Sequence, residues 1–138
     1  MKTSNISDKA EISDTILIAE DDDLNYKYLQ VLFSNFNVRI IRAFNGQEAV
    51  EKGLTDESIN LVLMDMKMPI LDGYEATRKL KAIKPNLPII ATTAYALSGD
   101  REKALAAGCD EYVSKPLLKE DLFEKIEKVK LMYAQHNS

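Results

Sequence analysis

The stretch LVLMDMKMPILDGYE at residues 61–75 places the carboxylate of Asp65 directly after four apolar residues and four residues before a proline. A continuous apolar run of this kind is typical of a parallel strand that is covered on both faces. Pro69 and Gly73 indicate that a turn follows the strand. The stretch therefore predicts a buried strand that ends on a charge, and that charge needs compensation.

Four further short apolar runs lie along the chain, and segments of helical period separate them; two of these runs are continuously apolar in the same way, at 16–19 and 89–91. The apolar runs are residues 15–20, 38–43, 59–65, 87–93 and 110–115, and the helical segments are 23–35, 46–54, 74–83, 100–107 and 119–133. Strands and helices that alternate in this order, with right-handed crossovers, form an open parallel sheet. The sequence predicts an α/β fold of the doubly wound class, with five strands and five helices.

Residue types at the ends of the helical segments indicate where helices begin and end. Asp23 and Asp100 stand where N-caps are expected, because an aspartate side chain accepts hydrogen bonds from the free N–H groups of the first turn. Gly108 follows the fourth helical segment, where a left-handed glycine commonly ends a helix. We therefore expect Asp23 and Asp100 as N-caps and Gly108 as a C-terminal glycine.

The composition fits a single domain. The chain has 138 residues, is 46% hydrophobic and carries a net charge of −4; its Lys and Arg residues form no block that would favour nucleic acid or an anionic membrane as partner. Cys109 is the single cysteine, which excludes an intramolecular disulfide and a cysteine-based zinc site. No run approaches the roughly 20 apolar residues of a membrane span.

The ends of the chain are expected to lie outside this domain. Residues 1–13 are polar and lack the apolar core of a secretory signal. We expect a tail at 1–13, a domain at 14–134 and a tail at 135–138 that contains His136, in a protein of the cytoplasm.

Polar residues concentrate where the predicted strands end. Ligands of an open α/β sheet bind beyond the carboxyl ends of its strands, and these ends carry Glu20 to Asp23, Asp65, Thr92 and Thr93, and Ser114 to Pro116. Crowded carboxylates repel one another and lose hydration, so a positive group must offset them. Carboxylate oxygens with room for water suit Mg²⁺.

This set of residues suits phosphoryl transfer. A divalent ion neutralises charge on the oxygens of a phosphoryl group, and Lys115 and Thr93 can contact other oxygens of the same group. The pattern is interpreted as a site at which Asp65 is the nucleophile that receives a phosphoryl group.

Four motifs resemble the receiver domains of two-component response regulators. They are AEDDDLN at 19–25, LMDMKMPILDG at 63–73, ATTAYA at 91–96 and GCDEYVSKP at 108–116. Their wording is nearest to the receivers of hybrid histidine kinases, and the resemblance covers residues 15–133. It implies a flavodoxin-like sheet of strand order 2-1-3-4-5.

The resemblance also implies a role for each matched residue of the acidic site. Asp65 is the phosphoacceptor. Asp21 binds Mg²⁺ directly and Glu20 binds it through water, with Mn²⁺ as an alternative ion. Asp65 and the backbone carbonyl of Lys67 are further ligands.

A second group of matched residues is expected to transmit the signal. Thr93 carries the hydroxyl that moves toward the phosphoryl group, Tyr112 is the aromatic residue that changes rotamer with it, and Lys115 contacts the phosphoryl group. The Lys115–Pro116 peptide bond is cis in the family, and X–Pro bonds are those in which that isomer costs little.

Three positions are variable in the family or depart from its usual pattern. Lys67 and Tyr95 occupy positions where side chains tune the lifetime of the phosphoryl group. Asp22 stands where many relatives have asparagine.

Alternative interpretations of single motifs are weaker than the joint one. An acidic run taken alone is more often a solvated loop, and a single Asp is commonly a turn residue. A dinucleotide-binding fold is disfavoured because no glycine-rich turn follows the first strand. A dehalogenase-type phosphatase usually has a second Asp two residues after the first, where this chain has Lys67.

The leading hypothesis is a phosphorylation-controlled switch and not a conventional enzyme, although slow self-dephosphorylation is expected. The expected partners are a histidine kinase or histidine phosphotransfer protein and a downstream protein target, with the chain a monomer or weak dimer. His136 lies in the expected tail, so the chain receives phosphate and does not donate it. A receiver-like binding module without phosphorylation is the alternative.

Overall fold

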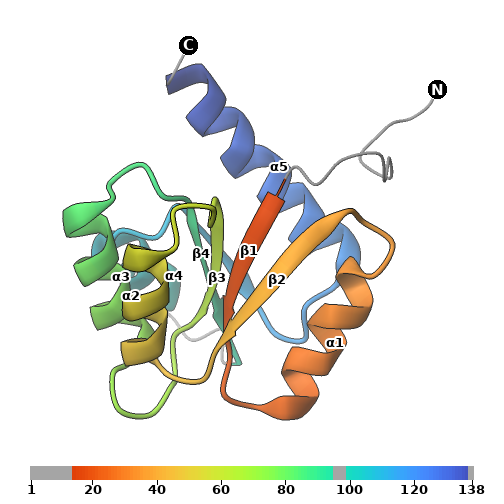
Figure 1. The fold of residues 1–138 in the computed structure, drawn as a ribbon, viewed down its shortest axis with the longest axis horizontal. Helices are drawn as coiled ribbons and strands as arrows, with labels where there is room; N and C mark the ends of the chain where they lie inside the picture. Colours follow the sequence, from red (N-terminus) through yellow and green to blue (C-terminus); the bar gives the residue numbers. More distant parts are fainter. Residues whose placement is uncertain (1–13, 95–98, 137–138) are drawn as a thin grey trace.

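The computed structural model describes residues 14–94 and 99–136, and it contains a five-stranded parallel sheet of order β2-β1-β3-β4-β5 (Figure 1). The strands are β1 (Asp14–Ala19), β2 (Val38–Ala43), β3 (Leu61–Asp65), β4 (Ile89–Thr93) and β5 (Glu111–Ser114). The helices are α1 (Asp23–Phe33), α2 (Gly46–Thr55), α3 (Gly73–Ile83), α4 (Asp100–Ala107) and α5 (Lys119–His136). The doubly wound fold and its strand order are confirmed.

The three central strands β1, β3 and β4 are buried on both faces, as their continuous apolar runs predict, whereas the edge strands β2 and β5 are only partly buried. One apolar layer joins alternate residues of the sheet, such as Leu17 and Met64, to helices α2, α3 and α4. A second layer joins the intervening residues, such as Ile18 and Leu63, to helices α1 and α5. Apolar side chains fill both layers. The polar residues that follow the strands therefore lie at the carboxyl edge of the sheet, outside these layers.

Two of the three predicted helix ends are wrong. Asp22 caps α1, because its side chain accepts from the N–H of Asn25 at 2.8 Å while Asp23 already lies in the first turn. Asp100 likewise lies inside α4, and Gly99 in the left-handed region precedes it without a side-chain cap. Gly108 is confirmed as the left-handed residue that ends α4, with φ 117°.

The last helix is longer than predicted. It continues through His136, so residues 135 and 136 belong to α5 and not to a tail. The hydroxyl of Tyr133 fixes this helix near its end, because it donates to Asp110 (2.9 Å) and accepts from Lys81 (2.6 Å). The expected tail at 1–13 and the residues 137–138 lie outside the described part of the chain.

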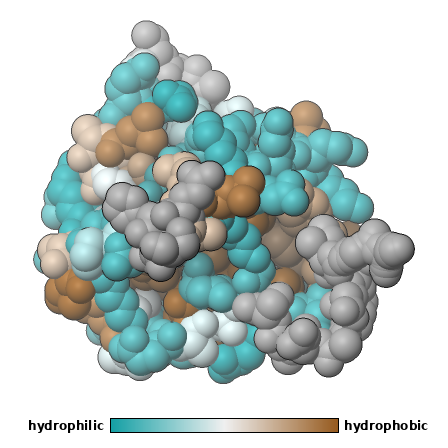
Figure 2. All heavy atoms as spheres, turned by 90° about the horizontal axis from the view of Figure 1, so that it is seen from above, coloured by the Kyte–Doolittle hydropathy of each residue, from teal (hydrophilic) through white to brown (hydrophobic). Residues whose placement is uncertain are grey.

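The surface of the domain is largely polar. Figure 2 looks onto the end of the molecule where the strands begin, and hydrophilic side chains cover most of the visible described surface, with small apolar groups between them. Across residues 14–94 and 99–136, no helix has the length and apolar character needed to cross a membrane.

Candidate functional site

Backbone hydrogen bonds extend the sheet beyond its strands and fix the residues that follow them. The N–H of Glu20 donates to the carbonyl of Ala43 at 3.0 Å, so the chain after β1 stays beside β2. The N–H of Lys115 donates to the carbonyl of Thr93 at 2.6 Å, which keeps the chain after β5 beside β4. The first polar residue after each of these strands is therefore held by the sheet.

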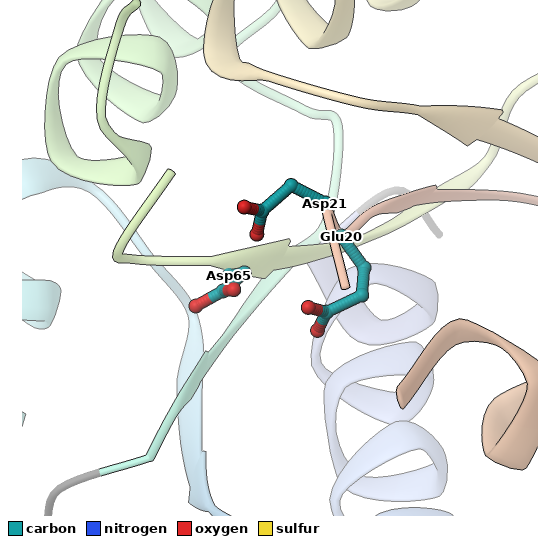
Figure 3. A group of neighbouring side chains, drawn as sticks. All are labelled: Glu20, Asp21 and Asp65. Atoms are coloured by element: carbon teal, nitrogen blue, oxygen red, sulfur yellow. The ribbon is translucent and has the colours of Figure 1, made fainter. Parts of the chain in front are cut away.

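Three carboxylates converge at this edge, as Figure 3 shows for Glu20 and Asp21 after β1 and Asp65 at the end of β3. One oxygen from each lies within 4.8 Å of the others. Glu20 and Asp65 are 2% and 5% exposed, whereas Asp21 is exposed. The cluster therefore has a buried side formed by two carboxylates and an open side formed by one.

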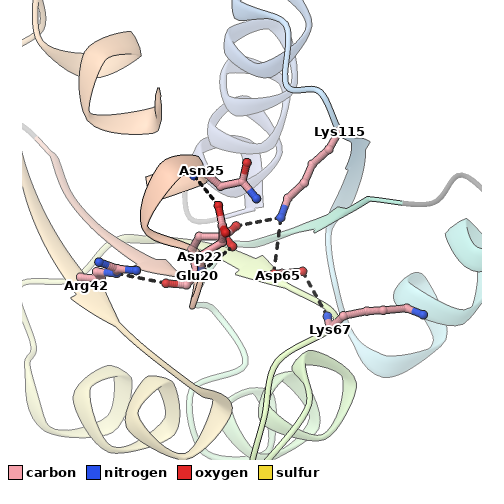
Figure 4. A network of polar contacts seen from close by, with 7 residues as sticks. All are labelled: Glu20, Asp22, Asn25, Arg42, Asp65, Lys67 and Lys115. Carbon is pink, nitrogen blue, oxygen red and sulfur yellow. Dashed lines mark hydrogen bonds and ion pairs between the residues drawn. The ribbon is translucent and has the colours of Figure 1, made fainter. Parts of the chain in front are cut away.

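Lys115 offsets the buried part of this charge. Its ammonium group donates to Glu20 at 2.8 Å and to Asp65 at 3.4 Å (Figure 4). Burial alone would lower the pKa of Lys115, but the hydrogen bond and charge of Glu20 and the charge of Asp65 outweigh burial and raise it. The lysine therefore stays protonated while it bridges strands β1, β3 and β5.

The environment of Asp65 disfavours its ionised form. Burial, followed by the charge of Glu20, raises the pKa of Asp65 from 3.8 to about 6, although Lys115 acts in the opposite direction. The backbone N–H of Lys67 also donates to Asp65, at 3.1 Å. Two carboxylates thus share the ammonium group of Lys115 and the third, Asp21, lies beside them, so the cluster keeps an excess of negative charge that a divalent cation would neutralise.

The donor atoms fit a hard divalent ion. All three side chains offer oxygen, which Mg²⁺ prefers, and exposed Asp21 leaves one side open to the water molecules that this ion retains. No cysteine or histidine lies in the cluster, which disfavours zinc. The residues present therefore suit Mg²⁺ better than a softer metal.

The family model of the response regulator receiver domain matches residues 16–127. The chain belongs to the receiver domain family. A relative of this receiver, hybrid signal transduction histidine kinase I of Dictyostelium discoideum, is 37% identical over 96% of the chain, which spans only 8% of that protein. The polar-differentiation response regulator DivK of Brucella anthropi is 36% identical over 75% of this chain and 85% of its own length.

Solved receiver domains share the fold. The receiver of a sensor histidine kinase from Pseudomonas aeruginosa, which has magnesium coordinated in its active-site cleft, is 34% identical with a TM-score of 0.76; the match covers 83% of this chain and 95% of that one. The receiver of Ssk1, solved with the Saccharomyces cerevisiae histidine phosphotransfer protein Ypd1, is 29% identical with a TM-score of 0.78; coverage is 86% and 90%.

The remaining predicted residues of the receiver lie around the same edge. Thr93 is the last residue of β4 and is buried, and Tyr112 lies in β5, partly buried against the α2–α4 layer. The Lys115–Pro116 bond is cis, as expected. Tyr95 lies outside the described residues, and the roles assigned to Thr93, Tyr112 and the Lys67 carbonyl stay predictions.

Two contacts to the Glu20 segment of the receiver were not predicted. The N–H of Asp22 donates to the Glu20 carboxylate at 3.2 Å, and Nε of Arg42 donates to the Glu20 carbonyl oxygen at 3.0 Å. The strand sequence VRIIRA predicts Arg42 only as a polar residue of an edge strand. Tyr26 and Phe44 flank the guanidinium of Arg42 in the structure. These two aromatic residues are the sequence feature that could have indicated a partly buried arginine.

Asp65 makes the stability of the metal-free receiver depend on pH. The pKa of Asp65 in the folded state, about 6, exceeds the ordinary value of 3.8, so the folded state holds the proton more tightly than the unfolded chain. The stability of the domain therefore falls as the pH rises from 3.8 to about 6. Asp65→Asn resembles the protonated form. We expect this variant to be more stable than wild type by about 1–2 kcal/mol near pH 7, and by less near pH 5.

Urea unfolding in the presence of EDTA, followed by circular dichroism at both pH values, measures this difference. A stability gap between Asp65→Asn and wild type that does not change with pH would contradict the prediction.

Proposed function

We propose that this receiver accepts a phosphoryl group on Asp65 from a phosphohistidine of a kinase or phosphotransfer protein. An oxygen of Asp65 forms the new bond to phosphorus, while the bond from phosphorus to the imidazole nitrogen breaks and the nitrogen keeps the electron pair. The observation that carries the proposal is the position of Asp65, which ends a buried strand beside Lys115 and two further carboxylates.

Mg²⁺ would be held by Glu20, Asp21 and Asp65, and it would neutralise charge on the phosphoryl oxygens during transfer. The related Pseudomonas receiver, with magnesium in its cleft, supports this assignment. Lys115 already lies 3.4 Å from Asp65 and can follow a phosphoryl oxygen with little movement. The Glu20 carboxylate keeps this ammonium group oriented at 2.8 Å.

Thr93 and Tyr112 are proposed to convert phosphorylation into a change of surface. Thr93 is the last residue of β4, at the same edge of the sheet as Asp65, and Tyr112 of β5 lies opposite Ala91 of β4. Movement of the Thr93 hydroxyl toward the phosphoryl group would leave space into which Tyr112 can turn. A downstream protein would then read the face formed by α4, β5 and α5.

Exposed apolar side chains around the acidic site are proposed to bind the phosphodonor. Leu24, Ile70 and Leu118 are 79%, 80% and 61% exposed. A hollow beside Lys115 is lined by Leu24, Asn25, Tyr28, Lys115, Pro116 and Leu117. An apolar rim around a charged centre suits a helix that presents a phosphohistidine among apolar residues.

Ile70 supports this assignment through its backbone. Its φ is 71°, and the N–H of Leu71 closes a three-residue turn onto the carbonyl of Pro69 at 2.7 Å. The left-handed region costs roughly 1–2 kcal/mol for a residue with a Cβ. The exposed Ile70 side chain adds nothing to the core. We therefore infer that the chain keeps this strained turn because Ile70 contacts the phosphodonor.

Leu24→Ala is expected to weaken the binding of purified Ypd1 by about tenfold, because burying a leucine side chain contributes about 1.5–3 kcal/mol and tenfold corresponds to about 1.4 kcal/mol. Titration calorimetry measures this affinity. Val31→Ala is the matched control, since Val31 is also exposed on α1 but lies two turns away from the site. Equal losses in the two variants would contradict the proposed surface.

Mg²⁺-dependent phosphorylation by acetyl phosphate tests the function itself. Wild-type protein incubated with both reagents should gain the mass of one phosphoryl group, and EDTA should prevent the gain. An unmodified protein under these conditions would instead favour the alternative, a binding module whose partner contacts survive Asp65→Ala.

A further inference from the structure

Arg42 is a partly buried cation that contacts the segment carrying Glu20 and Asp21. It lies in β2, an edge strand of the sheet, yet its side chain is only 14% exposed. The guanidinium lies 4.3 Å from the ring centre of Tyr26 and 4.0 Å from that of Phe44. Two aromatic rings therefore fix the position of this group and shield it from water.

The guanidinium contacts the segment after β1 at two points. Its Nε donates to the carbonyl oxygen of Glu20 at 3.0 Å (Figure 4), and its Nη1 pairs with the carboxylate of Asp23 at 2.9 Å. Asp21 lies between these two points. Because the Glu20 carbonyl and the N–H of Asp21 belong to one planar peptide group, the bond to Glu20 also fixes the direction in which the chain enters Asp21.

We propose that Arg42 is a positioning residue for the metal site, a role that rests on the function proposed above. The arginine holds the Glu20–Asp21 peptide so that the exposed Asp21 carboxylate faces Glu20 and Asp65. Asp21 needs such a support because its side chain is exposed and lies at the open side of the cluster.

The unpaired nitrogen of Arg42 argues against a role limited to stability. Nη2 is buried and has no hydrogen-bond partner among the described residues, and an unsatisfied buried donor destabilises the folded state. An apolar side chain could fill the space between Tyr26 and Phe44 without this cost, but it could not hold the Glu20 carbonyl. The contact to Glu20 therefore distinguishes arginine from a residue that only packs.

Charge and positioning predict opposite results for Arg42→Met. Loss of a positive charge near a cation site would tighten metal binding, whereas loss of a support to the ligands typically weakens it by about tenfold or more. Mn²⁺ titration of the full chain, followed by electron paramagnetic resonance of the free ion, measures the affinity. Arg39→Met is the matched control, because Arg39 lies on the same strand but contacts Ser58.

We expect the Mn²⁺ dissociation constant to rise about tenfold in Arg42→Met, to stay near the wild-type value in Arg39→Met, and to be intermediate in Arg42→Lys, which keeps a single donor group. The Mg²⁺ concentration for half-maximal phosphorylation by acetyl phosphate should rise in parallel, with a much smaller change in the rate at saturating Mg²⁺. If Arg42→Met does not fold, Arg42→Lys compared with Arg39→Lys gives the same test.

Each outcome distinguishes this inference from the proposed function. Unchanged or tighter binding by the Arg42 variants, with a wild type that binds Mn²⁺, overturns the positioning role alone. A wild type that binds no Mn²⁺ overturns the metal site and the positioning role together.

Discussion

Asp65→Asn is expected to abolish phosphorylation by acetyl phosphate completely. The amide keeps the shape of the side chain and can still occupy the end of β3, but it lacks the oxygen nucleophile that forms the bond to phosphorus. Glu20, the other buried carboxylate of the cluster, is occupied by hydrogen bonds from the ammonium group of Lys115 and the N–H of Asp22. Intact-protein mass spectrometry should show the added phosphoryl group in wild type and none in the variant.

Asp22→Asn is the matched control for this result. It removes one negative charge from the same acidic segment, and asparagine caps a helix about as well as aspartate, so α1 should keep its cap on the N–H of Asn25. We expect this variant to be phosphorylated. Labelling of Asp65→Asn, or loss of labelling in Asp22→Asn, would show that the acceptor has been assigned wrongly.

Gly73→Ala is expected to destabilise the domain by about 3 kcal/mol or more and to disturb phosphorylation at the same time. A Cβ at Gly73 would meet the carbonyl oxygen of Asp65 and lie 2.7 Å from Cα of Met66. Both are backbone atoms, one of Asp65 itself and one of the residue after it, so the clash can be relieved only if the loop or α3 moves. The gain of at most about 1 kcal/mol from alanine in a helix does not offset this cost.

Gly53→Ala provides the comparison. A Cβ at Gly53 would lie 2.6 Å from Cδ2 of Leu80, the end of a flexible side chain. That leucine can change its rotamer, so we expect a smaller loss of stability and unchanged labelling by acetyl phosphate. Chemical denaturation and the rate of labelling should be measured for both variants, and equal effects would contradict the importance of the Gly73 contact.

The parts of the structure that the sequence predicts well are those governed by burial. Continuous apolar runs identify strands that are covered on both faces, and the charge of Asp65 identifies where one such strand ends. The sequence places Glu20 and Lys115 in the same site, because both follow strands whose carboxyl ends lie at one edge of the sheet. Their direct contact at 2.8 Å is a product of the fold and has no local signal.

The sequence predicts poorly those features that depend on the conformation of individual residues. Within the acidic run after β1, Asp22 and Asp23 are equally good caps by composition, and only the backbone of Asp22 makes it the N-cap. Arg42 looks like a solvated edge residue because Phe44 is near it in the chain but Tyr26, the second ring that flanks its guanidinium, lies on helix α1. The helical continuation of α5 to His136 was likewise missed, since its last turn lacks a clear apolar period.

The contact between Lys115 and Glu20 joins residues that lie 95 positions apart in the chain. A ribosome that synthesises this protein makes Glu20 and Asp65 long before it makes Lys115, whose ammonium group contacts both carboxylates. Native-like pairing of the last strand is therefore a late event in the life of the nascent polypeptide. We therefore expect a chain that ends before β5, and so lacks the ammonium group of Lys115 beside Asp65, to receive no phosphoryl group from acetyl phosphate.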